Sequence, residues 1–133
     1  MSYDISALNG RHVVHIEGLE EGSERVVFTC SDGTEWTMCH KPDCCECVQV
    51  EDVVGDVDDL HDARVIDARC ETNSDSHPEG WNPHFVDESF TWTFYIIQTD
   101  KGAVTIRWLG SSNGCYSEGV DFDLTKSPRG VLA

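Results

Sequence analysis

Apolar and polar residues alternate with a period of two along most of the chain, which is the pattern of strands with one buried and one solvated face. No segment shows the longer period of an amphipathic helix. Short runs rich in Gly, Asp, Asn and Ser separate the alternating segments. We therefore predict eight strands, at residues 12–17, 25–30, 35–40, 47–53, 64–70, 89–99, 104–108 and 115–124.

Tight turns join some of these strands into hairpins. The pair Asp32-Gly33 supplies the positive φ that a tight turn requires, so residues 26–38 are expected to form one hairpin. Residues 100–102 turn a second hairpin, which we place at the centre of the core. Alternation predicts inward-facing side chains at Val14, Ile16, Val26, Phe28, Cys30, Trp36, Met38, Val48, Val50, Ile66, Ala68, Cys70, Trp92, Phe94, Ile96, Val104, Ile106, Trp108, Val120, Phe122 and Leu124.

Two segments lack this alternation. Residues 55–60 begin with an Asp at a plausible N-cap and carry further acids in the first turn, which predicts one short helix. Residues 71–88 hold a helix- or strand-breaking residue at nearly every second position and predict a long surface loop. Because that loop carries Trp81 and Phe85, we expect it to take part in docking to a partner.

Length and composition agree with one compact unit. The chain has 133 residues and is 39% hydrophobic, which is enough to close one core and too apolar for a disordered chain. We expect a single domain over residues 1–133, with an ordered core at 7–124 and a tail at 125–133. The expected fold class is α+β, mostly β: a single curved antiparallel sheet or a partly open barrel with one short helix.

The charge is strongly negative. Twenty-five acids against nine basic residues give a net charge of −16, which repels phosphate backbones and anionic membranes and argues against direct nucleic-acid binding. Fourteen acids and two arginines lie between residues 43 and 88, so this region alone carries −12. The acids lack the spacing of a calcium loop. The predicted partner-binding residues are Glu51, Asp52, Asp56, Asp58, Asp59, Asp62, Trp81 and Phe85.

The start of the chain lacks a basic segment followed by an apolar one, and no apolar run approaches the roughly 18 residues of a membrane span. We therefore expect a cytoplasmic protein. The seven cysteines are an odd number, and four lie within nine positions, from Cys39 to Cys47. Such close neighbours rarely reach disulfide geometry, which favours a reducing compartment.

The same cysteine-rich corner holds candidate metal ligands. Zinc accepts thiolate and imidazole, so His40, Cys44, Cys45 and Cys47 are a candidate zinc set, although the chain lacks the two separated ligand pairs of a zinc knuckle. In the alternative interpretation the thiols are buried small side chains and His40 caps the turn. A Cys–His nucleophile is disfavoured because nearby carboxylates raise a thiol pKa, and we expect no enzyme.

A second informative segment runs from Arg107 to Glu118 and places a Gly-rich loop between two strands. Two interpretations are open. In one, Arg107 pairs with Glu118 or Asp121 across a hairpin. In the other, a small anion such as a nucleotide is held by the loop amides and by a set of side chains. That candidate set is Arg107, Ser112, Asn113, Tyr116 and Glu118.

Several of these motifs resemble those of an uncharacterised family of small proteins encoded by bacteriophages and bacteria. Residues 40–46 match the pattern His-x-x-Asp-Cys-Cys-Glu, and residues 107–118 match Arg-Trp-x-Gly-x-Ser-Asn-Gly-x-Tyr-Ser-Glu. This chain has Cys115-Tyr116 where the family usually has Tyr-Tyr. The resemblance covers about residues 8–124 and implies a phage or mobile-element setting, but it implies no activity.

These observations predict a phage-type accessory protein that acts by binding. Its acidic face would occupy the basic nucleic-acid-binding surface of a host or defence protein, as an inhibitor that mimics DNA in the manner of anti-CRISPR and other anti-defence proteins. The alternative is a zinc-binding or small-anion-binding module. Homo-oligomerisation is left open.

Overall fold

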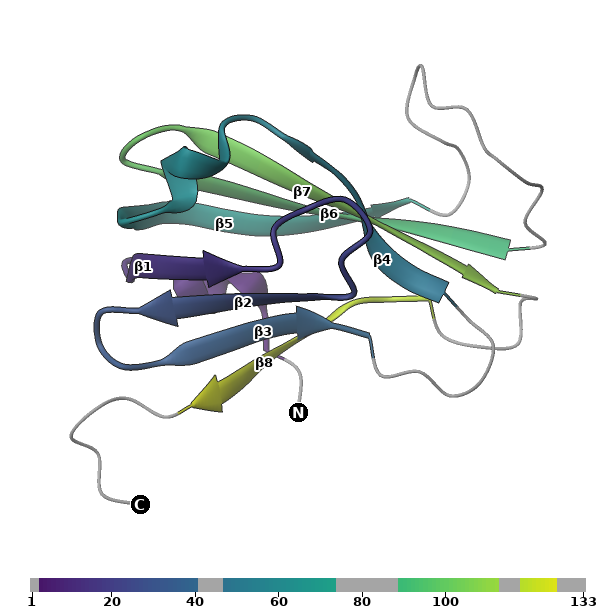
Figure 1. Cartoon of the computed structure of the whole chain (residues 1–133), viewed down its shortest axis with the longest axis horizontal. Coiled ribbons are helices and arrows are strands. Elements are labelled where there is room, and N and C mark those ends of the chain that lie inside the picture. The colour runs from purple at the N-terminus through teal and green to yellow at the C-terminus, as the bar shows by residue number, and fades with distance from the viewer. Residues whose placement is uncertain (1–2, 41–46, 74–88, 113–117, 127–133) are drawn as a thin grey trace.

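The computed structural model describes residues 3–40, 47–73, 89–112 and 118–126 (Figure 1). This part of the chain contains eight strands and two single turns of 3₁₀ helix. In chain order they are η1 (Ile5–Leu8), β1 (His12–Glu17), β2 (Arg25–Cys30), β3 (Glu35–Cys39), β4 (Cys47–Val54), η2 (Val57–Leu60), β5 (Ala63–Asn73), β6 (Ser89–Thr99), β7 (Ala103–Ser112) and β8 (Asp121–Lys126).

All eight strands belong to one antiparallel sheet in the order β4-β7-β6-β5-β1-β2-β3-β8, and the sheet does not close into a barrel. Its two halves, β4-β7-β6-β5 and β1-β2-β3-β8, are joined in the sheet by the pairing of His12 and Val13 with Arg64 and Ala63. Figure 1 shows the two halves as separate layers. Because both halves contribute to one buried apolar cluster, the core lies between them.

Most of the predicted inward positions are confirmed. Val26, Phe28, Trp36 and Met38 of the β2–β3 hairpin are at most 2% exposed, and the register Val26–Met38 and Phe28–Trp36 keeps them on one face. Val48 and Val50 of β4, Val104, Ile106 and Trp108 of β7, and Phe122 of β8 are also buried, at 6% exposure or less. The single sheet with one core thus confirms a mostly β fold.

The inward assignment was wrong at Val14 of β1 and at Ile66 and Cys70 of β5, whereas Ile16 packs against the core cluster and Ala68 is buried, as predicted. Each strand contains a β-bulge that shifts the alternation by one residue. In β1 the register shifts between Val13 and His15, so Val13 is buried and Val14 is exposed. In β5 it shifts between residues 65 and 67. Val65 and Ala68 therefore face the core, while Ile66 is 55% exposed and Cys70 is exposed.

The inward assignment was also wrong in most of β6. Tyr95 and Ile97 face the core cluster, whereas Phe94 and Ile96 are only partly buried. Trp92 is fully buried as predicted, but it lies outside the core cluster and stacks on Phe94 with ring centroids 5.9 Å apart. Because β6 carries apolar residues on both faces, alternation alone does not decide which face is buried.

The ends of several elements differ from the predictions. The expected helix at 55–60 is the 3₁₀ turn η2, and η1 was not predicted. Strand β5 extends three residues into the predicted 71–88 loop, β8 begins only at Asp121, and it includes two residues of the predicted tail. Residues 74–88 and 127–133 lie outside the described part of the chain. Neither 3₁₀ turn, nor any other described segment, is a helix long and apolar enough to cross a membrane.

Candidate functional site

The loop between β1 and β2 lies beside β4, which extends the acidic surface beyond the segment identified from sequence. The Gly22 amide donates to the Val50 carbonyl at 2.7 Å, and the Val50 amide donates to the Ser23 carbonyl at 2.7 Å. This contact brings three exposed loop glutamates next to the acids that follow Val50. They are Glu20, Glu21 and Glu24, and the sequence analysis missed them.

The turn η2 presents the second group of acids. Asp56 caps the turn by accepting a hydrogen bond from the Asp58 amide at 3.0 Å, and Leu60 anchors the turn in the core with 1% exposure. The Thr99 hydroxyl donates to the Asp59 carbonyl at 2.6 Å and ties the turn to β6. The Asp58 side chain is left exposed and forms no ion pair within the described residues.

Asp62 is held in a different way. Its φ of 51° lies in the left-handed region, and its carboxylate contacts His12 Nε2 at 2.6 Å. The hydrogen bond with His12 holds the pKa of Asp62 below its ordinary value, so this carboxyl stays ionised to lower pH. His61 lies beside His15 with ring centroids 6.0 Å apart. The predicted acid Asp62 is therefore charged but already has a partner.

Between these two acidic segments lies a groove of about 240 Å³. It is lined by Ile16 of β1, Leu19 of the β1–β2 loop, Val57 and Asp58 of η2, and His61. Val57 is 42% exposed although it is apolar. The same surface therefore combines carboxylates with an accessible apolar patch.

We call this surface the acidic face. Its acidic side chains come from the β1–β2 loop, from η2 and the residues beside it, and from the adjoining part of β4. It comprises Glu20, Glu21, Glu24, Glu51, Asp56, Asp58, Asp59 and Asp62. Five of these eight were predicted. The sixth predicted acid, Asp52, points to β7 instead and forms an ion pair with Arg107, whose Nε donates to Asp52 Oδ2 at 3.1 Å. The predicted aromatics Trp81 and Phe85 lie outside the described residues.

The Arg107 pairing corrects the prediction that its partner is Glu118 or Asp121. Glu118 is 7% exposed and accepts a hydrogen bond from the Thr91 hydroxyl at 2.9 Å. Ser112 ends β7, and Asn113 and Tyr116 of the candidate anion site lie outside the described residues. Since Asp52 already neutralises Arg107, the described residues offer an incoming anion little attraction at this point.

The candidate zinc ligands are only partly described. His40 Nδ1 lies 2.7 Å from the Gly119 carbonyl oxygen, which can only accept a hydrogen bond, so Nδ1 carries the proton and Nε2 is the nitrogen suited to a metal. Cys47 is exposed at the start of β4. Cys44 and Cys45 lie outside the described residues, and the described ones contain no group of three metal-ligating side chains.

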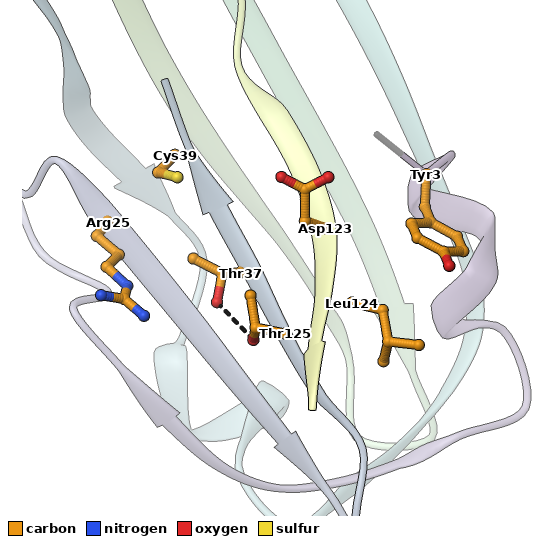
Figure 2. A pocket seen from close by; sticks show the side chains of 7 residues that line it. All are labelled: Tyr3, Arg25, Thr37, Cys39, Asp123, Leu124 and Thr125. Carbon is orange, nitrogen blue, oxygen red and sulfur yellow. Dashed lines mark hydrogen bonds between the residues drawn. The ribbon is translucent and has the colours of Figure 1, made fainter. Parts of the chain in front are cut away.

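A second depression, of about 460 Å³, lies over β2, β3 and β8 (Figure 2). Figure 2 shows the Thr37 and Thr125 hydroxyls pointing toward each other, at 3.0 Å. Arg25 and Asp123 come from β2 and β8, with β3 between them. Residues of opposite charge, hydroxyls and a thiol share this depression, so its chemistry selects no single class of ligand. The full lining is Tyr3, Arg25, Thr37, Cys39, Asp123, Leu124 and Thr125.

Fold and site together define a small antiparallel β-protein that presents carboxylates around an apolar groove between β1 and η2. The chain belongs to the family described as a domain of unknown function, DUF7448, whose model matches residues 6–122. Membership of an uncharacterised family was expected and is confirmed to that extent. No curated protein and no solved structure matches the chain.

Proposed function

We propose that this protein acts by binding and that its acidic face occupies a basic, nucleic-acid-binding surface of another protein. One observation carries the proposal. Two acidic segments far apart in sequence are held together by the backbone hydrogen bonds between Val50 and residues 22–23, so their exposed charges form one surface. Carboxylates held close together on one surface attract the lysines and arginines that otherwise hold phosphates.

The phage setting implied by the motifs makes a nuclease or a defence complex of the bacterial host the proposed partner, and the host cytoplasm the proposed location. Association with such a partner would be fast and salt-dependent, because exposed charges steer the encounter and are screened over about 8 Å at physiological ionic strength. The aromatic residues Trp81 and Phe85 remain proposed contributors to the same interface.

Charge reversal tests this proposal. Asp56 caps η2 and Asp62 pairs with His12, so we choose Glu20 and Asp58, whose exposed side chains form no ion pair within the described residues. The double variant Glu20→Lys/Asp58→Lys is expected to keep the fold and to weaken binding by about tenfold or more, because each lost pair is replaced by repulsion. The measurement is calorimetric titration of a partner captured from host lysate, with DNA as competitor.

The matched control is Asp67→Lys/Glu71→Lys, which changes the net charge equally at exposed positions of β5. It should alter affinity by less than about threefold, since these residues lie outside the acidic face. Equal effects of the two double variants would contradict the proposal. So would a partner that binds equally well at about 50 mM and about 500 mM salt, or one that DNA does not displace.

Zinc binding is a second candidate function, favoured by the hydrogen bond from His40 Nδ1 to Gly119. Ligand histidines usually donate their other ring nitrogen in this way. Protein purified without chelator would then contain about one equivalent of zinc, and its removal would lower the melting temperature because metal binding contributes to folding. His40→Ala should lower the zinc content. Metal-free protein with an unchanged melting temperature would exclude this function.

A further inference from the structure

The groove inside the acidic face has no role in the imitation of a phosphate backbone, which needs only charge. Its apolar walls come from Ile16, Leu19 and Val57, and Val57 is 42% exposed. Exposed apolar side chains that lie together and are rimmed by polar residues are typical of a protein-binding site. The groove is therefore a feature that the proposed function leaves unexplained.

The position of the groove selects the chemistry of its occupant. Asp58 and His61 form part of its wall, and the exposed residues Glu20 and Asp56 directly adjoin the lining residues Leu19 and Val57 in sequence. An apolar side chain that reaches the groove must therefore come from a segment whose flanking residues tolerate or prefer carboxylate neighbours. Lysine and arginine on either side meet this requirement, whereas acidic flanks would be repelled.

We propose that the groove anchors one apolar side chain of a basic segment of the partner, with lysines or arginines on both sides of it contacting the acidic rim. This inference rests on the proposed function, because it assumes that the acidic face is the binding surface. It adds a specificity element: charge brings basic proteins to this face, and the buried anchor distinguishes one basic protein from another.

Two synthetic peptides of equal charge test the inference. Each carries lysines on both sides of a central residue, which is leucine in one peptide and serine in the other. Because the leucine side chain is buried on binding, we expect the leucine peptide to bind about tenfold more tightly at about 50 mM salt. NMR titration of the wild-type protein is expected to shift the methyl signals of Ile16, Leu19 and Val57 more with the leucine peptide.

Val57→Ser and Ile66→Ser form a matched pair of variants, since both side chains are exposed and only Val57 lines the groove. Val57→Ser should abolish the preference for the leucine peptide, and Ile66→Ser should retain it. If wild-type protein binds both peptides equally, the groove is no anchor site while the acidic face still binds basic segments. A preference that survives Val57→Ser also overturns the inference. If neither peptide binds, the proposed function fails with it.

Discussion

Trp108→Ala is expected to lower the free energy of unfolding by about 3–5 kcal/mol. Trp108 is fully buried in the core cluster, opposite Val50 of β4 on one side and Thr93 of β6 on the other. Truncation leaves a cavity where β7 pairs with β4. Urea unfolding monitored by circular dichroism measures the loss.

Ile66→Ala is the control for this experiment, because Ile66 is 55% exposed and should cost less than about 0.5 kcal/mol. Phe94→Ala should fall between the two, since Phe94 is partly buried outside the core cluster. A loss below about 1 kcal/mol for Trp108→Ala, or a larger loss for Phe94→Ala, would show that the core does not lie between the two halves of the sheet.

Gly18→Ala is expected to have an effect of similar size, about 3 kcal/mol or more, for a backbone reason. Gly18 has a φ of 79°, which a residue with a Cβ adopts at a cost of about 1–2 kcal/mol. In addition, a Cβ at this position would overlap the carbonyl oxygen of Arg25, so the loop must shift. Because Leu19 and Glu20 follow directly, binding by the acidic face should weaken in the folded variant as well.

Gly10→Ala separates the two contributions. Gly10 has a similar φ of 82°, but no atom lies within 4 Å of an added Cβ. Gly10→Ala should therefore lower the free energy of unfolding only by the cost of the positive φ, about 1–2 kcal/mol, and leave binding unchanged. If both substitutions destabilise the protein equally in thermal unfolding, the close approach of Gly18 to Arg25 does not constrain the loop.

Strand positions could be predicted from sequence where one face alone is apolar. In β2 and β3 the alternation is regular and Asp32-Gly33 fixes the turn, so every residue predicted to face inward there is buried, although Thr37 is buried as well. The bulges in β1 and β5 cannot be recognised from the residue types alone. Each bulge is a single extra residue, and it shifts every later side chain of the strand to the other face. Short-range patterns therefore locate such strands but do not show which of their faces is buried.

The candidate site was predictable only in part for a related reason. The acids from Glu51 to Asp62 stand out as a run in the sequence. The loop glutamates join them only through the contact of Gly22 with Val50, which are 28 positions apart, and Arg107 meets Asp52 across 55 positions. The acid-rich sequence from Glu20 to Glu24 is a signal that could have identified the loop, but its location depends on tertiary contacts.

The pairing of β8 with β3 has a consequence for how the chain folds. The hydroxyls of Thr37 and Thr125 meet across 88 positions of sequence, and the register Trp36–Leu124 joins the first third of the chain to its end. Contacts of such separation slow folding, because the entropy of closing a long loop is lost before the contacts form. During synthesis, the outer edge of β3 therefore stays unpaired until residues 121–126 have left the ribosome, and the nascent chain is most prone to aggregation over that interval.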